Sequence, residues 1–234
     1  ANPCLGVRGI RNCLQEQSLF MTQLRAILRA GAHGRALIMY PMIAALEEVR
    51  AANRLLALAM ESLRTDGLAF DAAMKSGIMV ETPSAAITAD LLIQETDFFS
   101  IGSNDLTQYT LAVDRMNEKI SSLYCPFHPG VLRLIRSVID VANRAGEGKS
   151  VGLCGEMAAD PAATLLLLGM GLTEFSVNPP ALLRIKRMIT SVSKAYAEEV
   201  TTRALQLPTA AEVYTFLQAA VPTKLRQELQ LFDD

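Results

Sequence analysis

Acidic, amide and arginine side chains follow one short apolar segment in the middle of this sequence. The segment 97–101 ends at Gly102, Asn104 and Asp105 come directly after it, and Arg115 lies ten residues beyond Asp105. Polar residues that follow a buried parallel strand lie at the carboxyl edge of the sheet, where catalytic groups gather. A short helix after the strand would bring Arg115 back to that edge. A carboxylate and an arginine there could share a magnesium-bound, phosphorylated anion. The alternative is an ordinary helix start, with Asn104 or Asp105 as its N-cap.

A second carboxylate ends the preceding apolar segment. Glu81 closes the segment 77–81, so Glu81 and Asp105 would stand at neighbouring strand ends. Magnesium takes one or two protein carboxylates and completes its octahedron with water and substrate oxygens. The pair is therefore a candidate magnesium site. The alternative for Glu81 is a surface acid that is favoured by a helix N-terminus.

Two arginines are candidates for binding an anion. A guanidinium offers fixed, bidentate donors to phosphate or carboxylate. Arg115 follows the central motif, and Arg8 lies in the glycine-rich opening at 5–11. Arg8 could equally be a solvated surface residue.

Cys154 ends a third apolar segment, 150–154, between Gly152 and Gly155. Flanking glycines allow close approach of a ligand to the backbone. A thiol in this place could transfer a proton to or from a substrate carbon. The alternative is a small buried residue at a strand end.

Composition bounds the class of protein. The chain has 234 residues, 50% hydrophobic residues and a net charge of −2, which suits one globular domain or a large piece of one. Nothing predicts a nucleic-acid surface, a membrane-inserted segment or a signal peptide. The four cysteines lack CxxC spacing, so we expect free thiols and a cytoplasmic protein. His33 and His128 lie away from strand ends, and neither is expected to be catalytic.

Apolar segments alternate with helical ones along most of the chain. Strands are expected near 36–40, 77–81, 97–101, 150–154 and 173–177, and helices near 13–30, 45–65, 83–95, 128–145 and 160–169. Residues 112–127 form a polar insert, and Pro208 and Pro222 divide a helical tail at 180–234. Repeated β-α units predict a parallel sheet. Polar residues at three consecutive strand ends favour a (β/α)8 TIM-type barrel over an open sheet. Because only about five strands can be counted, we expect one incomplete barrel domain over 1–234.

The motifs together closely resemble the C-terminal phosphoenolpyruvate (PEP)-binding domain of Enzyme I of the bacterial sugar phosphotransferase system, or of a multiphosphoryl transfer paralogue. Six segments carry the resemblance: 2–8, 39–42, 78–83, 101–115, 154–157 and 166–171. The family implies a barrel of the PEP/pyruvate-binding superfamily that binds PEP and Mg2+ and forms a homodimer.

The resemblance also implies roles for individual residues. Glu81 and Asp105 would bind Mg2+, and Asn104, Asp105, Arg115 and Arg8 would form the PEP site. Cys154 would protonate the methylene carbon as enolpyruvate leaves. The phosphoryl group would pass from PEP to a histidine in a separate N-terminal domain, and from there to the histidine-containing phosphocarrier protein, which feeds sugar uptake.

Two departures from the family pattern matter. Nothing here resembles the phosphohistidine domain, and the first barrel strands, which carry two further arginines in the family, are missing from the sequence. We therefore expect a chain that is not competent alone and that has two unpaired strand edges. The alternatives are a domain of a pyruvate phosphate dikinase or PEP synthase, and an inactive dimerisation fragment.

Overall fold

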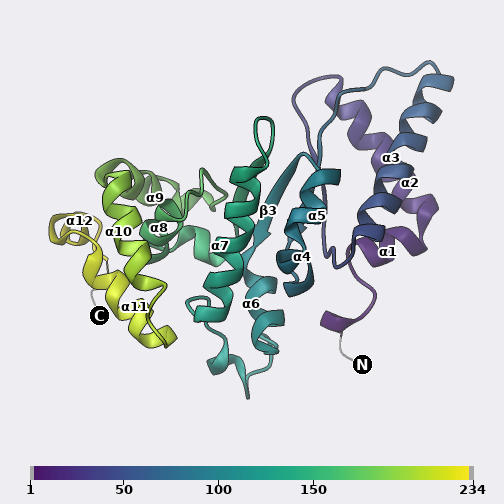
Figure 1. Cartoon of the computed structure of the whole chain (residues 1–234). Coiled ribbons are helices and arrows are strands. Elements are labelled where there is room, and N and C mark those ends of the chain that lie inside the picture. The colour runs from purple at the N-terminus through teal and green to yellow at the C-terminus, as the bar shows by residue number, and fades with distance from the viewer. Residues whose placement is uncertain (1–2, 232–234) are drawn as a thin grey trace.

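A parallel sheet of five strands forms the centre of the molecule, as the computed structural model of residues 3–231 shows (Figure 1). The strands follow one another in the sheet in chain order, β1 to β5. Their bounds are β1 Ile38–Tyr40, β2 Ser76–Val80, β3 Phe98–Gly102, β4 Ser150–Cys154 and β5 Glu174–Phe175. Every neighbouring pair is parallel, so all carboxyl ends of the strands lie at one edge.

Helices connect the strands and extend the molecule at both ends of the sheet. Figure 1 shows α1 to α3 at one end, α8 to α12 at the other, and α4 to α7 between them. The helices are α1 Ile10–Gln15, α2 Gln17–Gly31, α3 Leu46–Thr65, α4 Pro83–Ile87, α5 Ala89–Leu92, α6 Ser103–Leu111, α7 Pro129–Arg144, α8 Pro161–Gly169, α9 Pro179–Ser191, α10 Lys194–Ala204, α11 Ala210–Ala220 and α12 Thr223–Glu228. In the described part of the chain, no helix is both long and apolar enough to cross a bilayer.

The two faces of the sheet differ in burial. Side chains alternate between faces along a strand, and one face consists of fully buried aliphatic and aromatic residues. These are Ile38, Tyr40, Ile78, Val80, Phe99, Ile101, Val151 and Leu153. We call the opposite side the open face; its side chains remain partly or fully exposed. They are Met39, Met79, Phe98, Ser100, Cys154 and Glu174.

The predicted strands and the parallel sheet are confirmed, and the sheet is open in the described residues. The expected helix at 13–30 is wrong in one respect, because the helix begins at Ile10 and is interrupted at Glu16. Glu16 has φ −99° and ψ 60°, which departs from helical backbone angles and separates α1 from α2. The segment 83–95 likewise contains α4, α5 and a 3-10 turn rather than one helix.

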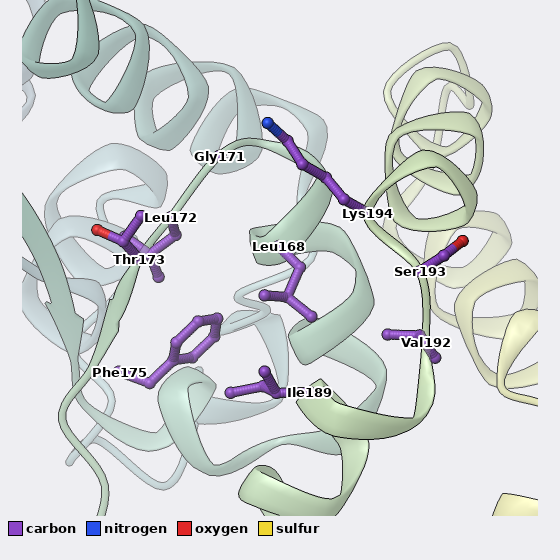
Figure 2. A pocket seen from close by; sticks show the side chains of 9 residues that line it. All are labelled: Leu168, Gly171, Leu172, Thr173, Phe175, Ile189, Val192, Ser193 and Lys194. Carbon is purple, nitrogen blue, oxygen red and sulfur yellow. The ribbon is translucent and has the colours of Figure 1, made fainter.

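Strand β5 is the last strand of the sheet and lies beside a hollow of about 380 Å³. Figure 2 shows the side chains of Leu168, Phe175 and Ile189 around this hollow, with Lys194 at its rim. The lining is mainly apolar and contains no carboxylate or arginine. This hollow is therefore separate from the strand-end residues that the sequence singles out.

Candidate functional site

The predicted site residues meet at the carboxyl edge of the sheet. Glu81 directly follows β2, α6 begins directly after β3, and Cys154 ends β4. The strand register pairs Val80 with Ile101 and Gly102 with Cys154, which places these three strand ends side by side. Parallel pairing therefore collects the two carboxylates and the thiol at one edge, as predicted.

Asp105 lies between the two predicted arginines. Its Oδ2 accepts a hydrogen bond from Arg8 at 3.1 Å, and its Oδ1 accepts one from Arg115 at 2.8 Å. Asp105 is buried, whereas both guanidinium groups are about one third exposed. The two cations therefore have donors that are still open to solvent or to an anionic ligand.

Glu81 is a buried carboxyl group beside Asp105. Its Oε1 accepts the backbone N–H of Met42 at 2.6 Å. Gly102 leaves room for it, because a Cβ at Gly102 would lie 2.8 Å from the Glu81 Cβ. The pKa of Glu81 is raised to about 7: burial is the main cause and the nearby Asp105 carboxylate adds to it, whereas the Met42 N–H and Arg8 act in the opposite direction.

Arg8 is positioned by the turn that precedes α1. Gly9 has φ 56°, and a Cβ there would lie only 2.7 Å from the Cβ of Met42. Ile10 donates its backbone N–H to the carbonyl of Pro41 at 3.1 Å. These contacts fix the turn against the segment after β1 and direct Arg8 toward Asp105.

The Cys154 thiol has two polar neighbours on β3. Its sulfur accepts a hydrogen bond from the Ser100 hydroxyl at 3.8 Å and donates one to the carbonyl of Ile101 at 3.6 Å. Burial raises the pKa of Cys154, and the negative charges of Glu81 and Asp105 act in the same direction. The group is therefore a thiol near neutral pH, which is the form that can donate a proton.

Asn104 has a different environment from the one predicted by the capping alternative. The helix α6 begins at Ser103 without a side-chain cap, so neither Asn104 nor Asp105 is its N-cap. The Asn104 Oδ1 accepts the backbone N–H of Glu156 at 3.1 Å instead. Gly155, with φ 94°, permits this contact, because a Cβ there would lie 2.9 Å from Asn104 Oδ1. The side chain thus joins α6 to the turn after Cys154.

Two buried carboxylates side by side are a fitting site for magnesium. The Asp105 carboxylate contributes to the raised pKa of Glu81, so a cation between the two groups would relieve their repulsion. Among residues 3–231, no cluster of three or more His, Cys, Asp or Glu side chains could hold a metal ion. A site with two carboxylates suits an ion that takes its other ligands from water and substrate.

Several residues at the site were not identified from the sequence. Tyr109 accepts a hydrogen bond from Arg8 at 3.2 Å and donates one to the carbonyl of Cys4. Gln108 Oε1 accepts the backbone N–H of Arg115 at 3.1 Å. The spacing of Asp105 and Tyr109, four residues apart on one helix face, is the signal that could have found the tyrosine.

The histidines lie outside the site, as predicted. The Nδ1 of His128 accepts the backbone N–H of Gly130 at 3.1 Å and caps α7. His33 follows the end of α2.

Comparison with known proteins supports the class of site that this geometry defines. Residues 1–194 match the family model of the PEP-binding domain of PEP-utilising enzymes, and the chain belongs to this family. Within it, the chain is 52% identical over 212 residues to a phosphoenolpyruvate-protein phosphotransferase of Haemophilus influenzae. It is 48% identical over 217 residues to the protein of that name from Bacillus subtilis, and 47% identical over 212 residues to that from Staphylococcus aureus. The predicted resemblance to Enzyme I is confirmed.

The chain spans little more than a third of the length of these relatives. The alignments include 91–93% of this chain but only 36–38% of each of the three relatives. More than half of each relative therefore has no counterpart in this sequence.

Proposed function

We propose that this chain is the PEP- and magnesium-binding domain of a phosphotransferase that transfers the phosphoryl group of PEP to a histidine in a separate domain. The observation that carries the proposal is the position of Asp105, which lies between Arg8 and Arg115 and beside the buried Glu81. The site offers two guanidinium groups and a pair of carboxyl groups to one small ligand. PEP carries both phosphate and carboxylate groups, which guanidinium groups bind.

Each residue has a role in this chemistry. Arg8 and Arg115 would hold the anionic groups of PEP through their exposed donors, and Asn104 would contribute an amide at the same edge. Glu81 and Asp105 would hold Mg2+, which when bound would neutralise charge on the phosphoryl group. The phosphorus–oxygen bond breaks as the phosphoryl group passes to the histidine. The resulting enolate of pyruvate then takes a proton from the Cys154 thiol at its methylene carbon, leaving a thiolate.

The open face of the sheet supports a barrel as the complete fold. Strands β1 and β5 each have one strand neighbour among the described residues, and the open face carries Met39, Phe98 and Ser100 without full burial. We infer that strands from the part of the relatives that this chain does not match pair with β1 and β5 and close a (β/α)8 barrel. We also propose that the tail at 180–234, whose described part contains α9 to α12, belongs to the same domain.

The same relatives suggest the partners. A phosphohistidine domain would receive the phosphoryl group and pass it to the histidine-containing phosphocarrier protein. A homodimer is proposed from the family resemblance. A cytoplasmic location is proposed as well, because Cys13, Cys125 and Cys154 form no disulfide in the structure.

Calorimetric titration of PEP into the 234-residue chain, with and without Mg2+, tests the proposal. We expect magnesium-dependent binding, and we expect inorganic phosphate to bind more weakly because it lacks the carboxylate. Absence of binding in a sample shown to be folded by circular dichroism would contradict the proposal for this chain.

A further inference from the structure

Ser100 is the polar residue of β3 that faces Cys154 across the strand pair. It lies on the open face of the sheet, two residues before Gly102, whose register partner is Cys154. Its own register partner is Gly152, which has no side chain. The neighbouring strand therefore leaves the Ser100 hydroxyl free to reach the sulfur.

The hydrogen bonds at the sulfur have a consistent direction. The Ser100 hydroxyl donates to Sγ at 3.8 Å, and the thiol donates its own hydrogen to the Ile101 carbonyl at 3.6 Å. Both partners belong to β3, whose hydrogen bonds to β2 and β4 hold it in place. The orientation of the thiol is thus determined by a rigid strand rather than by a loop.

We propose that Ser100 is the positioning residue for Cys154: its hydroxyl directs the thiol and stabilises the thiolate that proton donation leaves. The inference rests on the proposed function, in which the S–H bond breaks and a C–H bond forms at the methylene carbon. When the sulfur becomes negative, the bond from Ser100 becomes charge-assisted and roughly twice as strong. The thiolate also faces the carboxylates of Glu81, from the end of β2, and Asp105, from α6, both of which disfavour it. Among the described residues, Ser100 is the side chain whose hydrogen bond opposes them.

The first test is the alkylation of Cys154 by iodoacetamide in the 234-residue chain, measured at the level of peptides by mass spectrometry. Loss of one hydrogen bond to sulfur should slow alkylation at neutral pH by roughly 2- to 10-fold in Ser100→Ala. Ser100→Thr retains a hydroxyl and should restore the rate. Ser150→Ala removes a hydroxyl from the same face of β4 and is the matched control. Cys125 in the same digest reports whether the variant has changed the whole fold.

The second test is the exchange of pyruvate methyl hydrogens with D2O in the presence of Mg2+, followed by NMR. In the step assigned to Cys154, the thiol gives a proton to the methylene carbon. In the reverse step, the thiolate removes a proton from the methyl group of pyruvate, so the two steps together exchange this proton with solvent. We expect exchange by the wild-type chain, no exchange by Cys154→Ala, and a slowed rate in Ser100→Ala that Ser100→Thr recovers.

The outcomes separate the inference from the proposed function. Unchanged alkylation and exchange in Ser100→Ala, beside a wild-type chain that exchanges, would overturn the role of Ser100. No exchange by the wild-type chain would overturn the proton-donor function for this chain. The alkylation rate would then still decide whether Ser100 controls the thiol.

Discussion

At the scale of single residues, the carboxyl pair is the feature with the largest electrostatic consequence. Glu81 is buried, and its pKa is raised to about 7 from the value of 4.5 in an unfolded chain. Its neutral form therefore stabilises the fold below pH 4.5, and this contribution is lost as the pH rises through 7. Glu81→Gln, which stays neutral and keeps an acceptor for Met42, should be more stable than the wild type at pH 8, by at most about 3 kcal/mol.

Urea unfolding of the two proteins at pH 8 and at pH 4.5, without magnesium, measures this difference. The gap should close at the lower pH, where Glu81 itself is protonated. The same difference at both pH values would show that the fold does not raise the pKa of Glu81.

Asp105 is the residue on which ligand binding should depend most. Asp105→Asn removes the charge that holds Arg8 and Arg115, and it removes one of the two proposed magnesium ligands. We expect magnesium-dependent PEP affinity to fall by at least about tenfold, since the loss of one partner of a largely desolvated charge pair typically costs more than 1.4 kcal/mol. Titration calorimetry measures the affinity. Asp66→Asn, which breaks a more exposed ion pair with Arg25, should leave it unchanged.

The sequence identifies the site's carboxylates and thiol because a simple rule applies to them. Glu81, Asp105 and Cys154 each follow an apolar strand, and parallel strands end at one edge. Met42 and Ser100 follow no such rule. Met42 has φ 60° without being a glycine, and Ser100 matters through a contact with a residue 54 positions away. Such contacts depend on the register of the sheet, which the pattern of apolar residues does not specify.

At the scale of elements, α8 packs on α10 so closely that the contact has no space for an added methyl group at Gly169. A Cβ at Gly169 would lie 2.1 Å from the carbonyl oxygen of Ala197, and the Thr201 hydroxyl donates to the carbonyl of Leu166 across the same contact. Gly169→Ala must therefore separate the two helices. We expect a loss of roughly 1–3 kcal/mol in the free energy of unfolding.

Gly34→Ala is the matched control, because no atom lies within 4 Å of a Cβ at that position. Its free energy of unfolding in urea should stay close to that of the wild type. An equal loss in both variants would show that the helix contact does not determine the effect at Gly169.

Element boundaries were less predictable than the elements themselves. The long helices α3 and α7 agree with the ranges expected from the sequence, because each has a clear apolar face and a clear end. Strand β5 has two residues rather than the five expected. Among the described residues it pairs on one side only, with β4, so no second strand extends its hydrogen-bonded length there.

At the scale of the whole molecule, the edges of the sheet predict self-association. Strands β1 and β5 offer unpaired backbone groups, and the open face beside β1 carries Met39, which is 39% exposed. We expect the mass measured by light scattering to rise with concentration. Met39→Lys should reduce this association. Leu58→Lys, on the exposed side of α3, is the control that should not reduce it. A monodisperse monomer at all concentrations would contradict the prediction.

The double contact of Asp105 has a consequence for the order in which ligands bind. Asp105 cannot give the same oxygens fully to Arg8, to Arg115 and to a magnesium ion. Occupation of Asp105 by the ion would release guanidinium donors, which would add to the exposed donors that our proposal assigns to PEP. The two ligands should therefore be thermodynamically linked, each increasing the affinity for the other by the same factor. In the free protein, Asp105 therefore competes with PEP for hydrogen-bond donors of Arg8 and Arg115, and binding of both ligands would end this competition.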